Sequence, residues 1–316
     1  MFKHKKILFI APVFHGYEVI IKEKLEKFGA EVVFVPEREY SLRYKVLNNL
    51  NPSYIDRLQV DRYKHILEEN NNKRFDYLFV IRGYKMPSFF LSEFRRRNPA
   101  AVLIMYQWDS NRTNPFSHHI ESYDKVLSFD YKDCKDLGLQ YLPLFYTDDV
   151  LEFMGRQAKY DFFFMGTYLQ NRYDALMRFM NKYKRTYSIC AYIYMPFTSL
   201  IKEILKGNVK TLKYISIRHM PREQYLSILS ESKAIVDVSN AGQTGLAMRI
   251  IEALALRKKV VTNNWNIYGE PFYTSKSILV FDDKDPIIPD EFIDGEVNVF
   301  DGISSIDEWL SHLFKW

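Results

Sequence analysis

The residues best suited to chemistry in this chain lie in one stretch, Ala234 to Asn264. Residues 234–238 form a short β-branched apolar run, which is typical of a parallel strand covered on both faces. Residues 239–245 hold two glycines, an Asn and a Thr, and predict a tight turn where backbone comes close to a ligand. Residues 246–256 are strong helix formers, so we expect a helix there with Thr244 as its cap.

This order of strand, glycine turn and helix predicts a site for an anion. Bare glycine backbone at Gly245 leads into a helix N-terminus, whose amide groups and dipole favour negative charge. Arg249 lies one turn into the helix, and Glu252 follows three residues later on the same face. A cation beside a diphosphate and a carboxylate beside sugar hydroxyls are the groups that a nucleotide diphosphate requires. The alternative is an ordinary parallel βαβ unit in which Arg249 and Glu252 form a solvated ion pair.

The run GLAMRIIEALALRKKVVTNN, which begins at Gly245, resembles the donor-binding segment of GT-B glycosyltransferases. Gly245 falls on the first glycine of that motif, and Glu252 falls on the Glu that holds the nucleotide ribose in such families. The other Glu of the paired-glutamate families is Thr244 here, and the second glycine is Ala247. These departures favour the looser group that resembles lipopolysaccharide-biosynthesis and spore-maturation glycosyltransferases.

Further short motifs carry the same resemblance across most of the chain. YQWDS, SFDYKD and YLPLFY, in this order, resemble the N-terminal domain of the lipopolysaccharide-biosynthesis enzymes. The strand ending in Gly166, with Arg172 at the next helix start, resembles the opening of the donor domain, and the loop at Arg218 and His219 corresponds to the one under the nucleotide base. The resemblance thus implies a donor site made of Gly166, Arg172, Arg218, His219, Gln243, Thr244, Gly245, Arg249 and Glu252.

Composition limits the classes of protein that fit. The chain has 316 residues, enough for two domains, with 16% aromatic residues and a net charge of +5. This mildly basic balance allows a negatively charged ligand or an anionic membrane surface without demanding nucleic acid. Cys134 and Cys190 match no metal spacing and predict buried thiols in a reduced, cytosolic protein. The N-terminal apolar run is interrupted by Pro12 and predicts a first strand instead of a signal peptide.

The first half of the chain reads as a doubly wound α/β domain that begins with a strand, a turn, a helix and a strand over residues 6–35. His15 and Asp109 each follow a predicted strand, at the carboxyl edge where such sheets bind ligands. If the reaction inverts the sugar, a base must take the acceptor proton, and these two residues are the catalytic candidates. The alternatives are a loop histidine without a role and an Asp109 that orients the acceptor or caps the next helix.

We therefore expect an α/β chain of GT-B architecture, with two Rossmann-like doubly wound domains that face a central cleft. Residues 1–146 would form the acceptor-side domain, with a last short strand at 140–145, and 147–159 would form a linker. Residues 160–316 would form the nucleotide-sugar donor domain, with helices at 170–183 and 222–230. The segment 87–97, with its aromatics and arginine run, either rests on a membrane surface or forms a core-facing helix with a solvated basic end. DDKD, at 282–285, is predicted to be a turn and not a metal-binding triplet.

The resemblance implies a metal-independent, hexosyltransferase-type enzyme without a cofactor. It would move a sugar from a nucleotide-sugar donor to a glycan or lipid-linked acceptor in cell-surface polysaccharide or lipopolysaccharide assembly. We expect it to act in the cytoplasm, and a peripheral contact with the inner face of the membrane is compatible with the basic, aromatic first domain. The alternatives are a nucleotide-sugar epimerase of the same fold and a non-catalytic two-lobed ligand-binding protein.

Overall fold

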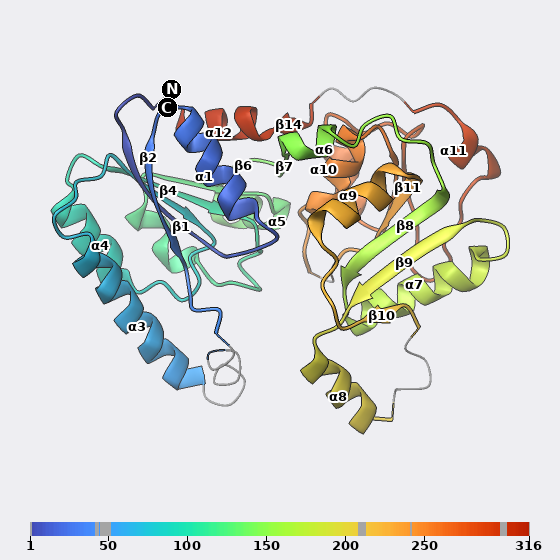
Figure 1. The fold of residues 1–316 in the computed structure, drawn as a ribbon, viewed down its shortest axis with the longest axis horizontal. Helices are drawn as coiled ribbons and strands as arrows, with labels where there is room; N and C mark the ends of the chain where they lie inside the picture. Colours follow the sequence, from blue (N-terminus) through green and yellow to red (C-terminus); the bar gives the residue numbers. More distant parts are fainter. Residues whose placement is uncertain are drawn as a thin grey trace. The chain divides into compact units, whose positions relative to one another are not determined.

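The computed structural model describes residues 2–41, 44, 52–207, 213–240, 242–297 and 302–315. The chain divides into two compact units (Figure 1). Unit 1 contains residues 1–143 and 306–316, and unit 2 contains residues 144–305. The C-terminal segment therefore belongs to unit 1, whereas the sequence analysis places it in the donor domain.

Within the described residues, unit 1 is built on a sheet of six parallel strands in the order β2-β1-β3-β4-β5-β6. The central strands are apolar runs that are buried on both faces, as parallel sheets require. All strands run the same way, so the loops that follow them meet at one edge of the sheet. The strands are β1 Lys6–Ala11, β2 Glu31–Pro36, β3 Tyr77–Ile81, β4 Val102–Gln107, β5 Lys125–Ser128 and β6 Gln140–Tyr141.

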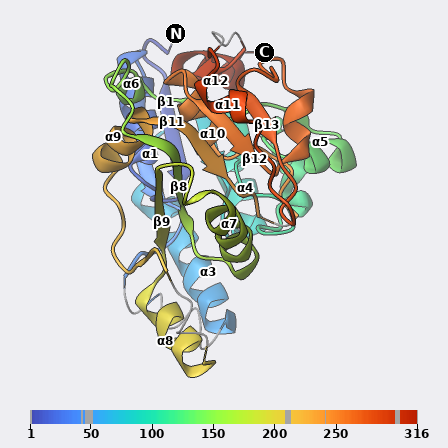
Figure 2. The ribbon, with the colours of Figure 1, turned by 90° about the vertical axis from the view of Figure 1, so that its right-hand side faces the viewer.

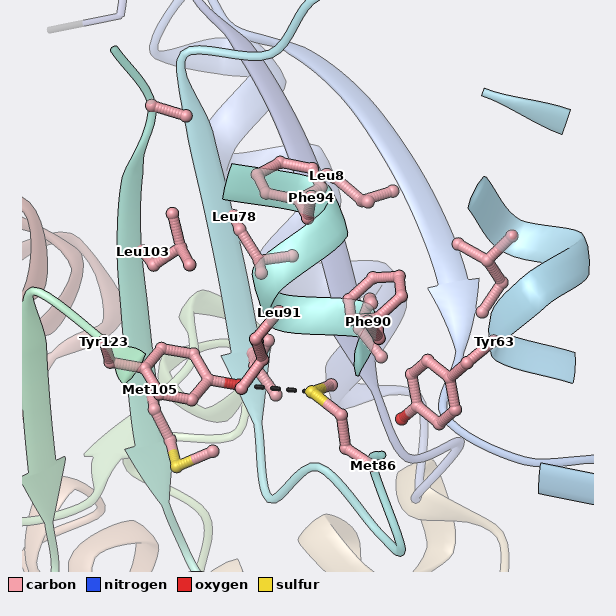
Figure 3. Packing of buried hydrophobic residues seen from close by; sticks show 14 of the residues in the cluster. Leu8, Tyr63, Leu78, Met86, Phe90, Leu91, Phe94, Leu103, Met105 and Tyr123 are labelled. Carbon is pink, nitrogen blue, oxygen red and sulfur yellow. Dashed lines mark hydrogen bonds between the residues drawn. The ribbon is translucent and has the colours of Figure 1, made fainter. Parts of the chain in front are cut away.

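Helix α4, Ser88–Arg97, settles the two interpretations of the aromatic and arginine-rich segment. Phe90, Leu91 and Phe94 point into the apolar core of unit 1 together with Leu78 and Leu103 (Figure 3). The three arginines at its C-terminal end are paired with acidic side chains on the protein surface. The core-facing interpretation is confirmed, and the membrane interpretation of this helix is wrong.

The other helices of unit 1 connect the strands and cover the sheet. Helix α1 ends at Lys27, and Gly29, with φ of 96°, allows the turn into β2. The C-terminal helix α12 packs on the sheet through Trp309, which is fully buried and meets Tyr106 edge-on with ring centroids 4.8 Å apart. The helices are α1 Tyr17–Lys27, α3 Pro52–Glu69, η1 Ser117–Ser122, α5 Tyr131–Leu137 and α12 Ile306–Phe314.

Over its described residues, unit 2 contains a second parallel sheet of six strands in the order β10-β9-β8-β11-β12-β13. Phe162, Phe164 and Val236 on the inner strands form its buried core with helix α7. The strands are β8 Tyr160–Thr167, β9 Ile189–Tyr194, β10 Ile215–Ser216, β11 Ser232–Asp237, β12 Lys259–Thr262 and β13 Ile278–Val280.

The helices of unit 2 differ in how they lie against this sheet. Helices α7 and α9 have the predicted bounds, and α10 packs beside β11 and β12. Helix α8 instead extends beyond the carboxyl end of β9 in both views (Figures 1 and 2). The helices are α6 Asp148–Leu151, α7 Gln170–Tyr183, α8 Phe197–Leu205, α9 Arg222–Ser230, α10 Met248–Ala255, η3 Trp265–Gly269 and α11 Asp290–Asp294.

One predicted strand, at 140–145, is wrong. Pro143 has no amide hydrogen to donate, and the segment divides into β6 of unit 1 and β7, Phe145–Tyr146, of unit 2. Strand β7 pairs in parallel with β14, Ser304–Ser305, in a small separate sheet. The predicted linker 147–159 contains helix α6, whose Val150 is fully buried. In the described part of the chain, no helix is long and apolar enough to span a membrane.

Candidate functional site

The carboxyl edge of the unit 2 sheet collects most of the predicted donor-site residues. Arg172 lies in the first turn of α7, after β8, and its guanidinium joins the ends of two strands. Nε donates to the carbonyl of Val238 at 2.9 Å, and Nη1 donates to the carbonyl of Thr167 at 3.0 Å. A Cβ at Gly166 would lie 3.3 Å from Cζ of Phe164, which is tight, and 3.5 Å from Cδ and Nη1 of Arg172, which is ordinary van der Waals contact. Burial and the nearby Arg249 lower the pKa of Arg172 to about 10, and it stays a cation at neutral pH.

Arg249 lies on the same edge, and it is paired with a residue that the sequence analysis missed. Its Nη1 donates to Oδ1 of Asp237, the last residue of β11, at 2.6 Å. Asp237 is fully buried, and its Oδ2 accepts hydrogen bonds from the hydroxyls of Thr262 at 3.0 Å and Ser239 at 3.2 Å. Arg249 and Arg172 therefore place two cations beside one buried anion, Asp237.

The loop between β11 and α10 follows the predicted turn, but the helix starts later than expected. Helix α10 begins at Met248, and its N-cap residue, Ala247, has no side-chain acceptor. The predicted cap by Thr244 is therefore wrong. The carbonyls of Thr244 and Gly245 instead accept hydrogen bonds from Nδ2 of Asn264 at 3.1 and 3.3 Å, and Gln243 donates to Gly245 at 3.2 Å. These bonds hold the loop while the helix N-terminus keeps its positive dipole.

Glu252 lies on the inner side of α10 and is only 2% exposed. Its Oε1 accepts from Nη1 of Arg222 at 3.0 Å, and its Oε2 accepts from the hydroxyl of Tyr225 at 2.7 Å. Arg222 also donates to Oδ2 of Asp149 at 2.5 Å and to the hydroxyl of Thr147 at 2.7 Å. The solvated Arg249–Glu252 pair of the alternative interpretation is thus wrong, because each side chain has another buried partner.

This network also bears on the ribose role that the resemblance implies for Glu252. Each carboxylate oxygen has a second lone pair, so a ribose hydroxyl would share the carboxylate with Arg222 and Tyr225 or replace one of them. Burial opposes the ionised form of Asp149, but hydrogen bonds from Arg222 and Thr147 lower the pKa of its carboxyl below the ordinary value. Ionised Asp149 in turn orients Arg222 toward Glu252.

Arg218 and His219 follow β10 at the same edge. The imidazole of His219 stacks on the ring of Tyr194, with ring centroids 3.6 Å apart and planes inclined by 29°. The carbonyl of Arg218 accepts hydrogen bonds from the hydroxyls of Tyr192 at 2.5 Å and Ser216 at 3.2 Å. These hydrogen bonds fix the backbone of the loop beside the stacked rings of His219 and Tyr194.

In unit 1, the two catalytic candidates follow different strands, but the structure brings their loops together. His15 follows β1 in a left-handed conformation, with φ of 51°, and its ring meets Phe14 edge-on. Phe14 in turn contacts Trp108, the neighbour of Asp109, with ring centroids 6.1 Å apart. The alternative role of Asp109 as a helix cap is wrong, because the next helix, η1, has Phe116 at its N-cap and Asp109 is paired with Arg82.

Arg82 of unit 1, to which the sequence assigns no role, contacts Asp109. Its Nη1 lies 3.3 Å from Oδ2 of Asp109, and its Nη2 forms an ion pair with Glu37, whose side chain is fully buried. The backbone of Arg82 is left-handed, with φ of 68°, and its carbonyl accepts from the amide groups of Gln107 at 2.9 Å and Asn114 at 3.0 Å. Arg82 is therefore held rigidly and orients the Asp109 carboxylate. An arginine followed by glycine at the end of a buried strand was the sequence signal for it.

Segment 282–285 is a turn, as predicted, in which Asp282 accepts a hydrogen bond from the backbone amide of Lys284 at 2.8 Å. Asp283 accepts from Nδ2 of Asn263 at 2.8 Å, which ties this turn to the end of β12.

We compared the sequence and the structure with known proteins. Neither the protein families nor the curated proteins compared with the sequence give a match. Among solved structures, an alpha-glucosyltransferase in complex with UDP and a DNA containing a HMU base aligns over 90% of this chain and 88% of its own, at 11% identity and a TM-score of 0.60. The catalytic domain of Starch Synthase IV from Arabidopsis thaliana, bound to ADP and acarbose, aligns over 93% and 88%, at 8% identity and a TM-score of 0.56.

A UDP-GlcNAc 2-epimerase from Neisseria meningitidis, bound to UDP-GlcNAc, aligns over 82% of each chain, at 12% identity and a TM-score of 0.50. At these identities the likeness establishes the fold. The chain has the GT-B architecture of two Rossmann-like α/β units with parallel sheets, as the sequence analysis predicts.

Proposed function

We propose that this protein is a glycosyltransferase that moves a sugar from a nucleotide-sugar donor to a hydroxyl acceptor. Unit 2 holds the donor at the carboxyl edge of its sheet. The glycine loop and the N-terminus of α10 face the diphosphate, the stack of His219 on Tyr194 receives the base, and Glu252 binds the ribose.

The observation that carries this proposal is the pair of guanidinium groups beside the glycine loop. Arg172 and Arg249 are fixed at the ends of β8 and β11, and Asp237 neutralises only one of the two charges. Negative charge grows on the diphosphate leaving group in the transition state, so cations fixed in advance lower the barrier. The same two cations supply the charge that a divalent metal provides in metal-dependent transferases, which supports a metal-independent reaction.

We propose that unit 1 acts on the acceptor. His15 and Asp109 lie on loops that meet at the carboxyl edge of its sheet. Either side chain accepts the proton of the attacking hydroxyl if the reaction inverts the sugar. The contact with Arg82 fixes the position of Asp109 and suits it to orient the hydroxyl.

The wider role that we propose is hexosyl transfer to a glycan or lipid-linked acceptor in cell-surface polysaccharide or lipopolysaccharide assembly. This work takes place in the cytoplasm, with the protein in peripheral contact with the inner face of the membrane. Nucleic acid is not the expected acceptor, so transfer of sugar to duplex DNA in an acceptor panel would contradict this part of the proposal.

Thermal unfolding with a panel of nucleotides tests the donor site. A nucleotide diphosphate at 100 times its dissociation constant stabilises the native state by about 2.7 kcal/mol. For a unit of this size, that is a rise in melting temperature of roughly 5–10 °C. Glu252→Ala is expected to reduce the rise, because it removes the ribose acceptor. An unchanged nucleotide affinity in this variant would show that the ribose lies elsewhere.

The acceptor side is tested by transfer kinetics. His15→Ala and Asp109→Ala are expected to lower kcat for transfer while the nucleotide dissociation constant stays within about threefold of wild type, because neither residue lies in unit 2. If both variants transfer sugar at the wild-type rate, unit 1 has no catalytic role at these residues.

The second candidate function is that of a nucleotide-sugar epimerase, and the structural likeness to the Neisseria epimerase supports this alternative. The two reactions differ in their need for an acceptor. An epimerase converts the nucleotide sugar alone to its epimer, whereas a transferase leaves the configuration of the unreacted donor unchanged. Proton NMR of a donor panel incubated without acceptor distinguishes them.

A further inference from the structure

Helix α8 exposes its apolar face and buries its acidic residue, which is the reverse of the usual arrangement in a globular protein. Phe197, Ile201, Ile204 and Leu205 are 60%, 41%, 46% and 82% exposed, although large apolar side chains normally face the core. The acidic residue of the helix, Glu203, is instead the buried one, at 9% exposure. The spacing of the four exposed residues places them on one face, because residues three and four apart are neighbours on a helix.

The position of α8 agrees with this inverted pattern. The helix starts directly after the carboxyl end of β9 and extends away from the unit 2 sheet, where it covers neither face (Figures 1 and 2). Its apolar face is therefore presented outward. We call the exposed side chains of Phe197, Ile201, Ile204 and Leu205 the α8 face.

Charge around the α8 face favours one kind of occupant. Among the described residues of 197–216, three are basic, Lys202, Lys206 and Lys213, and one is acidic, Glu203. Oε1 of Glu203 lies 2.8 Å from Nζ of Lys206, so the excess of charge around the helix is positive. Lys202 and Lys213 are exposed. Lysines beside an apolar helix face are the pattern of helices that lie in a membrane interface, where they contact anionic headgroups.

We propose that α8 docks this protein on a membrane surface rich in anionic lipid, with the α8 face inserted among the lipid chains and the flanking lysines at the headgroups. A second copy of the chain is the less suitable occupant, because a two-fold interface would bring the lysines of both copies together. This inference deepens the proposed function and takes its biological sense from it, because a lipid-linked acceptor is found at such a surface. It also replaces α4, whose apolar face is buried, as the membrane-contacting segment.

Co-sedimentation of the full chain with vesicles tests the proposal without any activity measurement. We expect binding to phosphatidylcholine vesicles that contain about 30% phosphatidylglycerol, and weak binding to phosphatidylcholine alone. The I204S/L205S variant removes apolar area from two exposed positions, which leaves the fold intact, and is expected to bind at least tenfold more weakly. K202Q/K213Q is expected to lose at least fivefold, with a weaker dependence on salt.

Matched controls lie elsewhere on unit 2. Ile287, which is 61% exposed, and the exposed Lys184 lie outside α8, so I287S and K184Q are expected to bind vesicles within about twofold of wild type. The proposal is overturned if the wild-type chain ignores anionic vesicles, or if the controls lose as much binding as I204S/L205S. A dimer in light scattering that dissociates in I204S/L205S would overturn it in favour of a second copy.

The same variants keep this test separate from that of the proposed function. I204S/L205S is expected to show the full nucleotide-induced rise in melting temperature in vesicle-free solution. Vesicle binding by a wild-type chain that no nucleotide stabilises would leave the membrane inference standing and refute the donor site. A wild-type chain that a nucleotide stabilises but that does not bind anionic vesicles would refute the membrane inference alone.

Discussion

Replacing Arg249 by Met is the most informative single change, because it separates the stability of unit 2 from donor binding. Asp237 is fully buried, and Arg249 is the cation bonded to it at 2.6 Å. Removing one partner of a buried ion pair costs about 3–5 kcal/mol, since the other charge stays buried without compensation. Asp237 keeps its bonds from Thr262 and Ser239, and the side chain of Arg249 is 20% exposed. We therefore expect a loss at the lower limit, about 3 kcal/mol, or roughly 6–12 °C in melting temperature.

The double variant D237N/R249M shows how much of the stability lost in R249M is due to the unpaired charge of Asp237. A neutral amide at position 237 still bonds to the hydroxyls, so most of the lost stability is expected to return. Nucleotide affinity is not expected to return, because a charge-assisted hydrogen bond to phosphate, of about 1.5–3 kcal/mol, is lost in both variants. That energy corresponds to roughly 10- to 100-fold in the dissociation constant.

Urea unfolding and nucleotide titration of the single and double variants measure both effects. R257M serves as the control for loss of charge, because Arg257 is an exposed arginine that follows α10. If R249M keeps the wild-type stability and nucleotide affinity, the pair has neither the structural nor the binding role assigned to it. If D237N/R249M binds nucleotide as tightly as wild type, Arg249 does not contact the phosphate.

Two further predictions concern positioning residues. Hydrogen bonds from Arg222 help to hold the pKa of Asp149 below its ordinary value, so ionised Asp149 stabilises the folded state above pH about 4, and that contribution is lost as pH falls through the folded-state pKa. Asp149→Asn is therefore expected to have a lower free energy of unfolding than wild type at pH 7, and the difference is expected to shrink in acid. Urea unfolding at several pH values measures this difference, and a difference that is constant with pH would contradict the prediction. Glu37→Gln removes the buried charge that holds Arg82, and Arg82 in turn positions Asp109. We expect this variant to have a lower kcat with unchanged nucleotide affinity. An equal kcat in mutant and wild type would show that Arg82 does not need Glu37 to hold its position.

Much of the fold was predictable because its elements are defined by local patterns. Helices α7 and α9 have the bounds that their apolar period predicts, and α9 begins directly after Pro221, which favours a helix start. The parallel strands are buried runs of apolar residues, which local sequence shows well. Residues 140–145 do not form the one strand that their local pattern predicts, because the two halves pair in different sheets with partners far along the chain.

The site was predicted less completely than the fold. The cluster Gly245 to Glu252 could be found, because strand, glycine turn and helix lie consecutively in the sequence. The side chains that contact this cluster could not be found from the sequence, because Arg222 is 73 residues from Asp149 and 30 residues from Glu252 along the chain. Asp237 is an exception, since a carboxylate at the end of an apolar strand is itself a signal for a paired or functional group.

Helix α8 shows a different limit of sequence reasoning. Its spacing predicts an amphipathic helix whichever side is inward, because periodicity gives the angular width of an apolar face and not its direction. Only the position of Glu203 in the fold shows that the apolar side chains face outward. Direction is decided by the contacts of the flanking chain, which the pattern does not contain.

The central claim is that the loop before α10, with Arg172 and Arg249 beside it, binds the diphosphate of an activated sugar. A crystal structure of the protein soaked with the nucleotide that most raises its melting temperature tests this claim most directly. The account predicts that the diphosphate lies within hydrogen-bonding distance of the 242–249 backbone and of at least one of the two guanidinium groups. A nucleotide bound away from this edge of the unit 2 sheet would contradict it.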